Sequence, residues 1–344
     1  MRPSFHPRLI NDPFGDPGVY VEFMFERRAI LFDLGDLHAL WPRKILKVTH
    51  AFVSHTHMDH FVGFDQVVRV CLGRNKRIRL FGPPGLIEQV AHRLAAYTWN
   101  LVRDYPEDFS ISVTEVHPGK RGVRAEFACR TAFQRQEAGT AAFADGVLVD
   151  DDTVRVRAVM LDHKVPCLAF SLEEKAHVNV WKTKLEELGL PIGPWLKGMK
   201  DAVLRGDPDE SPCRVWWRDG AEERQRTVPL GWLKERVLRI VPGQKIVYVV
   251  DAVYHAENAR AIVELARHAD VLFIEAAFLH QDAERAAERA HLTAHQAGLL
   301  AREAGAKAMV PMHFSPRYAG QGDRLREEAE RAFASRPTSV RDGT

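Results

Sequence analysis

The sequence predicts an α/β fold, and three observations support this prediction. Short apolar runs typical of buried strands fill the first fifty residues. From Ser110 to Met160 the residues are typical of β-structure, and apolar and polar residues alternate most clearly from Val154 onward. Beyond residue 245, strand-like and helix-like segments alternate regularly, which favours sheets covered by helices.

Individual elements follow from these patterns. Asp33 to Asp36 breaks a strand pattern, and Gly82 to Gly85 forms a turn before a segment with helical spacing. In the N-terminal part we predict strands at Gly18 to Phe25, Ala29 to Phe32, Ala51 to Val53 and Ile78 to Phe81, and a helix at Leu86 to Val102. In the C-terminal part we predict strands at Cys167 to Leu172, Lys245 to Val250, Val271 to Ile274 and Ala308 to Met312, with helices at Ala256 to Ala269, Asp282 to Arg289 and Thr293 to Ala304.

The composition fits one large domain spanning residues 1–344. Hydrophobic residues make up 46% of the chain, enough for a sizeable core, and the net charge of +2 argues against non-specific coating of nucleic acid. No apolar run reaches the ~18 residues of a membrane span, and no signal-peptide core follows the first residues. Four widely spaced cysteines without a Cys-x-x-Cys pair indicate reduced thiols, so we expect a cytoplasmic protein.

The composition and the periodicity of the sequence change between Glu173 and Trp232. Lysines, glycines and prolines mix there with five tryptophans, without sustained strand periodicity. We expect residues 173–232 to form an arm inserted into the domain, the alternative being a lid of helices packed on the core. The tryptophans could stack on bases or could belong to a core.

The strongest functional signal is a run of four metal-binding side chains directly after the strand predicted at Ala51 to Val53. Alternate residues of an extended loop point to one side, so His55 and His57 can hold one ion together. Asp59 and His60 lie past the turn and can face a second ion. Imidazole and carboxylate groups at this density suit zinc or another divalent metal.

Three further side chains of the same kinds stand at or near the ends of predicted strands, namely His163, Asp251 and His313. Ligands in α/β proteins gather at the carboxyl ends of strands, so we expect these three to converge on the first cluster. The seven residues together predict a site for two metals. Asp33, also at a strand end, could fix the tautomer of a ligand histidine, the alternative being a plain turn aspartate.

The run from His55 to His60 matches His-x-His-x-Asp-His, the signature of the metallo-β-lactamase superfamily. Within it, the chain resembles ribonuclease Z, the family of tRNA 3′-end-processing endonucleases. The resemblance covers roughly residues 30 to 320. The segments that carry it are Val53 to Gly63, Asp162 to Pro166, Leu188 to Gly198, Glu275 to Phe278, His291 to Ala294 and His313 to Tyr318.

This resemblance implies an αββα four-layer sandwich with the active site at one edge, a homodimer, and two zinc ions per chain. Sites rich in imidazole also accept manganese, iron or cobalt. The resemblance divides the seven residues between two ions that share one carboxylate: His55, His57 and His163 for the first ion, Asp59, His60 and His313 for the second, and Asp251 for both.

The resemblance also implies catalytic roles. Asp59 would orient and deprotonate the attacking water, and His291 would donate a proton to the leaving oxygen. We pair His291 with Glu275 as an orienting carboxylate, the alternative being a structural ion pair. Arg317 and Tyr318 follow the last ligand and could contact a substrate phosphate, although an arginine there could also form a surface ion pair.

Two departures from the family pattern bear on the substrate. Asp251 is followed by Ala252 and preceded by Val250, where the family has Gly-Asp-Thr, so the carboxylate is kept but its surroundings differ. The family's arm is rich in glycine and basic residues and holds tRNA, whereas the basic residues between Glu173 and Trp232 are offset by acidic ones. Phosphate contacts dominate nucleic-acid affinity, so this arm is weak evidence for tRNA.

We therefore predict a dinuclear-metal phosphodiesterase of ribonuclease Z type, acting on tRNA precursors and not on a membrane. One alternative within the same fold is a hydrolase of a small phosphodiester or another ester, with the arm as a lid. An alternative of a different class is a non-catalytic RNA-binding or scaffold protein. Seven metal-ligand side chains argue against a scaffold, which has no need of them.

Overall fold

The computed structural model describes residues 4–24, 26–119, 121–175, 177–219 and 222–335. The chain divides into two compact units, and each is described by itself: Met1–Leu148, Arg157–Ser171 and Lys245–Thr344 form the first, and Val149–Val156 and Leu172–Gln244 form the second. Within the described residues, no helix combines the length and the apolar character needed to cross a bilayer.

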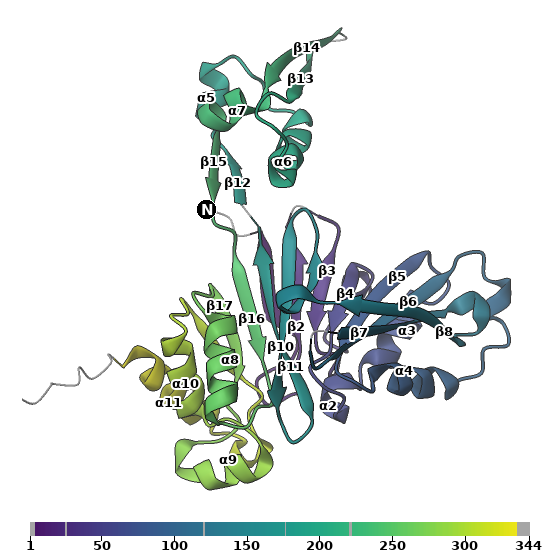
Figure 1. Ribbon diagram of the computed structural model, residues 1–344, viewed down its shortest axis with the longest axis vertical. Helices are drawn as coiled ribbons and strands as arrows, with labels where there is room; N and C mark the ends of the chain where they lie inside the picture. Colours follow the sequence, from purple (N-terminus) through teal and green to yellow (C-terminus); the bar gives the residue numbers. More distant parts are fainter. Residues whose placement is uncertain (1–3, 25, 120, 176, 220–221, 336–344) are drawn as a thin grey trace, which may run out of the picture. The chain divides into compact units, whose positions relative to one another are not determined.

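The first unit contains an eight-stranded sheet whose strands lie in chain order from β1 to β8 (Figure 1). The strands β3 to β6 run parallel, because helices connect each of them to the next. The outer pairs at both ends of the sheet are antiparallel. The strands are β1 (Phe5–Leu9), β2 (Val19–Phe23), β3 (Ala29–Phe32), β4 (Val48–Phe52), β5 (Lys76–Gly82), β6 (Phe109–His117), β7 (Arg121–Ala128) and β8 (Arg135–Ala142).

Helices cover one face of this sheet with apolar side chains spaced three or four residues apart. In α3 the buried side chains are Phe64, Val67, Val68 and Cys71. Helix α4 ends at Ala95 instead of the predicted Val102. The indole N–H of Trp99 donates to the carbonyl of Leu94 at 2.7 Å, so a side-chain hydrogen bond replaces the next helical turn. The helices here are α1 (Pro42–Ile45), α2 (Met58–Phe61), α3 (Phe64–Cys71), α4 (Leu86–Ala95), η1 (Val102–Asp104), η2 (Cys129–Thr131) and η3 (Ala144–Gly146).

The second sheet has six strands in the order β18–β17–β16–β11–β10–β9. Its strands β16, β17 and β18 run parallel, with helices in the connections. All four strands and three helices predicted for the C-terminal part are present within a few residues. The strands are β9 (Val147–Asp150), β10 (Val154–Asp162), β11 (Pro166–Glu174), β16 (Lys245–Val249), β17 (Val271–Glu275) and β18 (Met309–Met312). The helices are α8 (Ala256–Ala266), η4 (His280–Asp282), α9 (Ala283–Arg289), α10 (Ala294–Glu303), η5 (Pro316–Tyr318) and α11 (Gly322–Ala334).

A layer of buried aromatic side chains joins the two sheets of the first unit. The ring of Phe32 in β3 lies 5.6 Å from that of Phe52 in β4. On the facing sheet, the rings of Phe170 in β11 and Tyr248 in β16 lie 5.8 Å and 5.6 Å from Phe32. Because α3 and α4 cover the outer face of one sheet and α8 and α10 cover that of the other, the predicted αββα order of layers is confirmed (Figure 1).

The second unit has a hydrophobic core of its own. Trp195 is 3% exposed and donates its indole N–H to the carbonyl of Pro191 at 2.9 Å, so this tryptophan serves packing. Strand β15 (Leu238–Val241) pairs antiparallel with β12 (His177–Val180). The segment predicted as an insert ends at Trp232 and so leaves β15 out. This strand is too short to show the alternation of apolar and polar residues by which strands are predicted. The other elements are α5 (Lys182–Glu187), α6 (Trp195–Arg205), β13 (Pro212–Asp219), β14 (Glu222–Pro229) and α7 (Leu230–Val237).

Candidate metal centre

The histidine run lies in the first unit, where the chain leaves β4. His57 has an extended backbone (φ −60°, ψ 154°) and directly precedes α2. His55 and His60 are buried, whereas His57 is exposed. The predicted change from an extended loop to a turn therefore occurs between His57 and Asp59.

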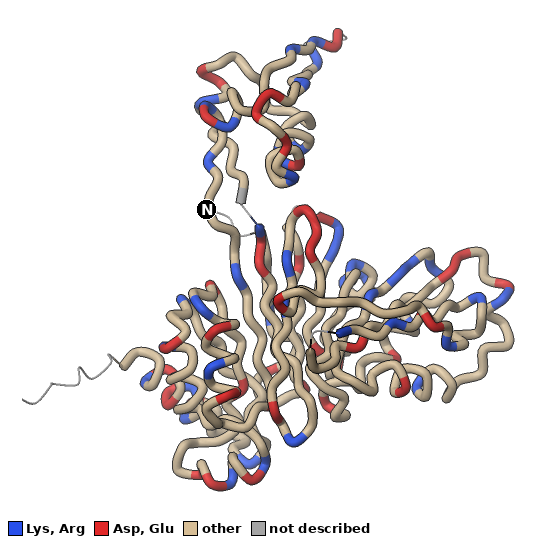
Figure 2. The backbone as a smooth tube through the Cα atoms, viewed as in Figure 1, with Lys and Arg blue, Asp and Glu red and all other residues tan. Residues whose placement is uncertain are grey.

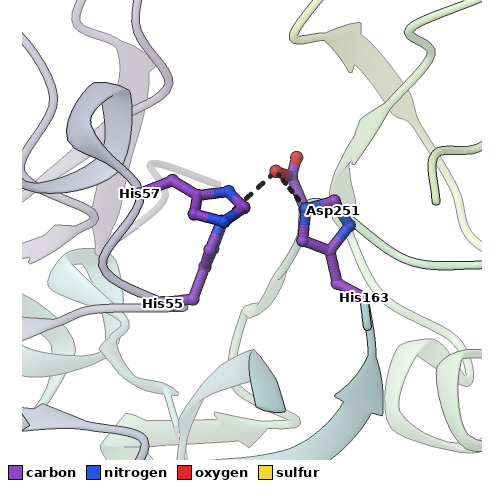
Figure 3. Close-up of side chains that lie close together, drawn as sticks. All are labelled: His55, His57, His163 and Asp251. Carbon is purple, nitrogen blue, oxygen red and sulfur yellow. Dashed lines mark ion pairs between the residues drawn. The ribbon is translucent and has the colours of Figure 1, made fainter. Parts of the chain in front are cut away.

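Four of the predicted ligands form one cluster, in which a ligand atom of each lies within 4.8 Å of the others: His55, His57, His163 and Asp251. The Nε2 atoms of His55 and His163 each lie 3.4 Å from Oδ2 of Asp251 (Figure 3). His163 follows β10, and Asp251 lies two residues past β16. The structure thus brings residues from three strand ends to one point.

A second cluster contains Asp59, His60 and His313, with ligand atoms again within 4.8 Å of one another. It adjoins the first cluster through the same carboxylate. The Nε2 atom of His60 lies 3.3 Å from Oδ2 of Asp251, and Nδ1 of His313 lies 2.7 Å from Oδ1. Asp251 therefore lies between the two clusters, and all seven predicted ligands are together.

At this edge of the sheets, Asp33, Asp251 and His313 have a left-handed backbone, and so does Lys164, next to His163, with a φ of 61°. The φ angles of Asp33, Asp251 and His313 are 56°, 47° and 55°. Such a conformation costs a non-glycine residue about 1 kcal/mol or more, and it is retained where the surrounding structure requires it. Asp33, Asp251 and His313 come just after β3, β16 and β18, where the side chains of the two clusters meet.

The two clusters contain buried polar atoms that have no hydrogen-bond partner among the described residues. They are His55 Nε2, His60 Nε2, Asp251 Oδ1 and His313 Nδ1; the last two lie 2.7 Å apart but without the geometry of a hydrogen bond. An unsatisfied buried polar atom costs about 1–3 kcal/mol, so their concentration at one place needs an explanation. Imidazole nitrogens and carboxylate oxygens are the ligands of zinc and related divalent metals. The donor set therefore fits two such ions.

Asp33 contacts the Nδ1 side of the His60 ring, opposite the Nε2 atom that faces Asp251. Its Oδ2 lies 2.8 Å from Nδ1 of His60, and it also accepts hydrogen bonds from the hydroxyl groups of Ser54 and Tyr248, both at 2.8 Å. All four side chains are buried. A carboxylate at Nδ1 places the proton there and leaves Nε2 as the ligand atom, which is the role we predicted for Asp33.

A metal-site histidine also contacts helix α9. The Nδ1–H of His163 donates to the carbonyl of Ala290, just past α9, at 2.7 Å. Next to it, Nζ of Lys164 donates to the carbonyl of Glu288 at 2.6 Å. The end of α9 is therefore fixed directly to the segment that carries His163.

The charges around the clusters shift their pKa values. Burial and the nearby charge of His60 lower the pKa of His55 to about 2. Burial raises the pKa of Asp59, but the hydrogen bond from His313 and the charge of His60 outweigh it and lower the pKa to about 2. Burial lowers the pKa of His60, but Asp251 and Asp33 raise it to about 10. A metal that binds here would therefore meet His55 and Asp59 already deprotonated and would displace a proton from His60.

The predicted pair of Glu275 and His291 lies beside Asp251. Glu275 is fully buried, and its Oε2 is 2.9 Å from Nδ1 of His291. Its Oε1 accepts the backbone N–H groups of Ala252 and Leu292, at 2.7 Å and 3.2 Å. Burial lowers the pKa of His291, but the Glu275 carboxylate outweighs it and raises the pKa above its ordinary value. Glu275 therefore lies behind His291 and is not part of the lining of the cleft described next.

A cleft of about 390 Å³ opens over the clusters in the first unit. Its charged lining includes Arg317, for which we predict contact with a substrate phosphate, and two arginines of α9, Arg285 and Arg289, which the sequence did not predict. They lie in a surface helix where acidic and basic residues alternate, so no sequence pattern distinguishes them. The full lining comprises His57, Asp59, Asp251, Ala277, Phe278, Arg285, Arg289, His291, His313, Phe314, Ser315, Pro316 and Arg317.

Tyr318 does not belong to this lining. It is 4% exposed, its hydroxyl donates to Asp282, and the same oxygen accepts the N–H of Leu279 at 3.3 Å. We predicted that Tyr318 could contact a substrate, but its side chain packs beneath the loop that carries Arg317.

The chain is similar to known proteins in sequence and in fold. A family model described as "Beta-lactamase superfamily domain" matches residues 212–314. Two solved structures share the fold: the metallo-β-lactamase fold protein YhfI of Bacillus subtilis has a TM-score of 0.52 at 14% identity, covering 93% of this chain and 86% of that one. Human tRNase Z, short form, has a TM-score of 0.52 at 18% identity, covering 91% of this chain and 93% of that one.

The sequence relationship is closer than these structural ones. The chain is 32% identical to the Ribonuclease Z of Deinococcus radiodurans over 295 residues, which is 84% of this chain and 83% of that protein. Identity at this level over most of both chains shows common descent, and the site above keeps every ligand position that the resemblance implied. The chain belongs to the ribonuclease Z family, a family of metal-dependent hydrolases.

Proposed function

We propose that this protein is a two-metal endoribonuclease that cleaves tRNA precursors at their 3′ ends. One observation carries the proposal: seven side chains of metal-binding type meet around Asp251 at a cleft, with His291 at its edge. The names of the relative and of the human structural neighbour, Ribonuclease Z and tRNase Z, support tRNA as the substrate.

The ligands divide as the two clusters do. We assign His55, His57 and His163 to one zinc ion and Asp59, His60 and His313 to the other, with Asp251 shared. Manganese, iron and cobalt suit the same donors. Two divalent ions held by these residues would supply a water nucleophile near neutral pH and would stabilise both oxygens that are exchanged at phosphorus.

The protein's own groups move the protons. The side chain of Asp59 is 44% exposed toward the cleft, which suits a base that takes the proton of the attacking water. That oxygen forms a bond to phosphorus while the bond to the leaving oxygen breaks. His291, held by Glu275, donates the proton that the leaving alkoxide needs.

Two further features belong to the proposal. We place the protein in the cytoplasm, which is supported by its four free cysteines, three of them buried. We also propose a homodimer, on the family resemblance, and sedimentation of the purified protein at two concentrations tests it.

The decisive experiment compares two substrates with zinc-loaded protein: a tRNA precursor with a 3′ trailer, and the chromogenic ester bis(p-nitrophenyl) phosphate. We expect removal of the trailer, and loss of both metal and activity in Asp251→Ala. His38→Ala, which changes a histidine 86% exposed and outside the site, should leave both unchanged.

The other outcomes each replace the proposal with one of the alternatives. Hydrolysis of the small ester without tRNA cleavage would identify a hydrolase of small phosphodiesters. Absence of both activities in a protein with two bound metals would contradict an enzyme and leave the RNA-binding or scaffold alternative.

A further inference from the structure

We infer that Arg285 and Arg289 form an anion-binding subsite beside the metal centre, which holds a phosphate next to the one that is cleaved. The inference rests on the proposed phosphodiesterase function and makes it more specific. It requires a substrate with at least two neighbouring phosphates, such as an RNA chain, rather than an isolated phosphodiester.

The two arginines share one face of α9. They are four residues apart, so their side chains lie one above the other on the helix. Both line the cleft together with Asp251 and His291. Acidic and basic residues alternate along α9 (Figure 2), but Glu284 and Glu288, each one position before an arginine, are not part of the cleft lining. The helix therefore turns its basic face to the cleft and its acidic face elsewhere.

The guanidinium groups in the cleft are free to bind an anion. In the part of the chain that the structure describes, no carboxylate pairs with the side chains of Arg285, Arg289 or Arg317. Some surface arginines elsewhere are paired with a carboxylate, as Arg77 is with Glu126 at 2.6 Å and Arg93 is with Asp65 at 2.7 Å. Three unpaired guanidinium groups at one cleft attract a polyanion, because each can bind a phosphate through two parallel hydrogen bonds.

Helix α9 holds these arginines at a fixed position relative to the metal ligands. Nζ of Lys164 binds the carbonyl of Glu288, and Nδ1 of His163 binds that of Ala290, which places anchors on both sides of Arg289. The backbone N–H of His291 donates to the carbonyl of Ala286 at 2.9 Å. A phosphate bound by the arginines is thereby positioned relative to both His163 and His291.

The size of the cleft agrees with two phosphates. Its volume of about 390 Å³ lies in the range of sites that enclose ligands larger than a single phosphate group. The phosphate that is cleaved would lie next to Asp251, where the side chains proposed as metal ligands meet. The arginines of α9 are then left for its neighbour along the chain, and Phe278 and Phe314 contribute apolar side chains to the lining of the cleft.

The test uses the double variant Arg285→Ala/Arg289→Ala, with Arg260→Ala as a matched control, since Arg260 is exposed on α8 and outside the cleft. All are zinc-loaded full-length proteins. We expect KM for a tRNA precursor to rise about tenfold or more, as loss of charged hydrogen bonds implies, with kcat changed little. The kinetic constants for bis(p-nitrophenyl) phosphate, which has one phosphate, should stay the same. Replacing both arginines with lysine should restore part of the affinity.

Binding of a fluorescent oligoribonucleotide, measured by anisotropy on the same variants, separates this inference from the proposed function. Cleavage by the wild type with equal KM and equal RNA binding in the double variant would overturn the subsite alone. A wild type that binds RNA through these arginines but cleaves neither substrate would overturn the phosphodiesterase function and keep the subsite. Equal losses on both substrates would also overturn the subsite, because the arginines would then act on the cleaved phosphate.

Discussion

The carboxylate of Asp33 lies 2.8 Å from Nδ1 of His60, and both side chains are inaccessible to solvent. This contact decides which nitrogen of His60 remains for a metal. Nε2 is thereby directed to Asp251, 3.3 Å away, so a residue that touches no substrate sets the geometry of a predicted ligand.

Asp33→Asn should therefore lower zinc affinity by about 10- to 100-fold, because an amide supports the ligand tautomer of His60 less well. Competition with a chromophoric chelator measures the affinity. Asp36→Asn is the matched control, since the side chain of Asp36 is 49% exposed and its carboxylate contacts the neighbouring His38 outside the two clusters. Equal affinity of Asp33→Asn and wild type would contradict the role.

Asp59→Asn should keep much of the bound metal while kcat falls by about 10²–10⁴-fold, since six other ligands remain but the base is lost. Metal analysis and single-turnover cleavage on the same sample measure both quantities. Unchanged turnover would exclude Asp59 as the base, and loss of all metal would show that it acts chiefly as a ligand.

Glu275→Gln should move the pH dependence of kcat. The carboxylate raises the pKa of His291 against the effect of burial, so its removal lowers that pKa. A proton donor works only below its pKa, so the alkaline limb of the profile should shift to lower pH. Glu264→Gln, an exposed change on α8, should leave the profile in place. A limb that does not move would mean that another group donates the proton.

A second pH effect concerns stability and involves Glu22 of β2. Hydrogen bonds from Lys44 and Lys47 lower the pKa of Glu22 from 4.5 to about 2. Its stabilising contribution is therefore complete above pH 4.5 and is lost as the pH falls toward 2.

Glu22→Gln should accordingly reduce the free energy of unfolding by about 1 kcal/mol at pH 7, and the difference from wild type should shrink below pH 4.5. Melting midpoints of metal-free protein across this range measure it. The exposed Glu107→Gln serves as the control. A difference that stays constant down to pH 2 would show that the two lysines do not stabilise the charged form.

The side chains that meet at the candidate metal centre could be selected from the sequence because their signals are local. Four of them lie within six residues, and the other three follow strands whose apolar patterns are strong. The sheet order and the layers depend on those same patterns. The left-handed backbone of His313 and Asp251 could not be predicted, because only the packed sheet edge imposes it.

The cleft wall was harder to predict, as the neighbours Arg317 and Tyr318 show. Both follow the last ligand, but successive residues of a 3₁₀ turn point about 120° apart. In η5 one of them therefore faces the cleft while the other packs inward against Asp282. For Arg285 and Arg289 the cleft-facing side of α9 is set by hydrogen bonds from residues more than a hundred positions away. No local pattern carries that information.

The site also joins distant parts of the chain, since Asp59 and His313 are 254 positions apart. Unfolding separates them, and only the run His55 to His60 remains as a local chelator. By mass action, a metal stabilises the folded chain according to the ratio of its affinities for the folded and the unfolded forms. Removing the metal with a chelating agent should therefore lower the melting temperature of the whole first unit. The decrease should be smaller than the affinity of the folded site alone predicts, because the unfolded chain also binds some metal.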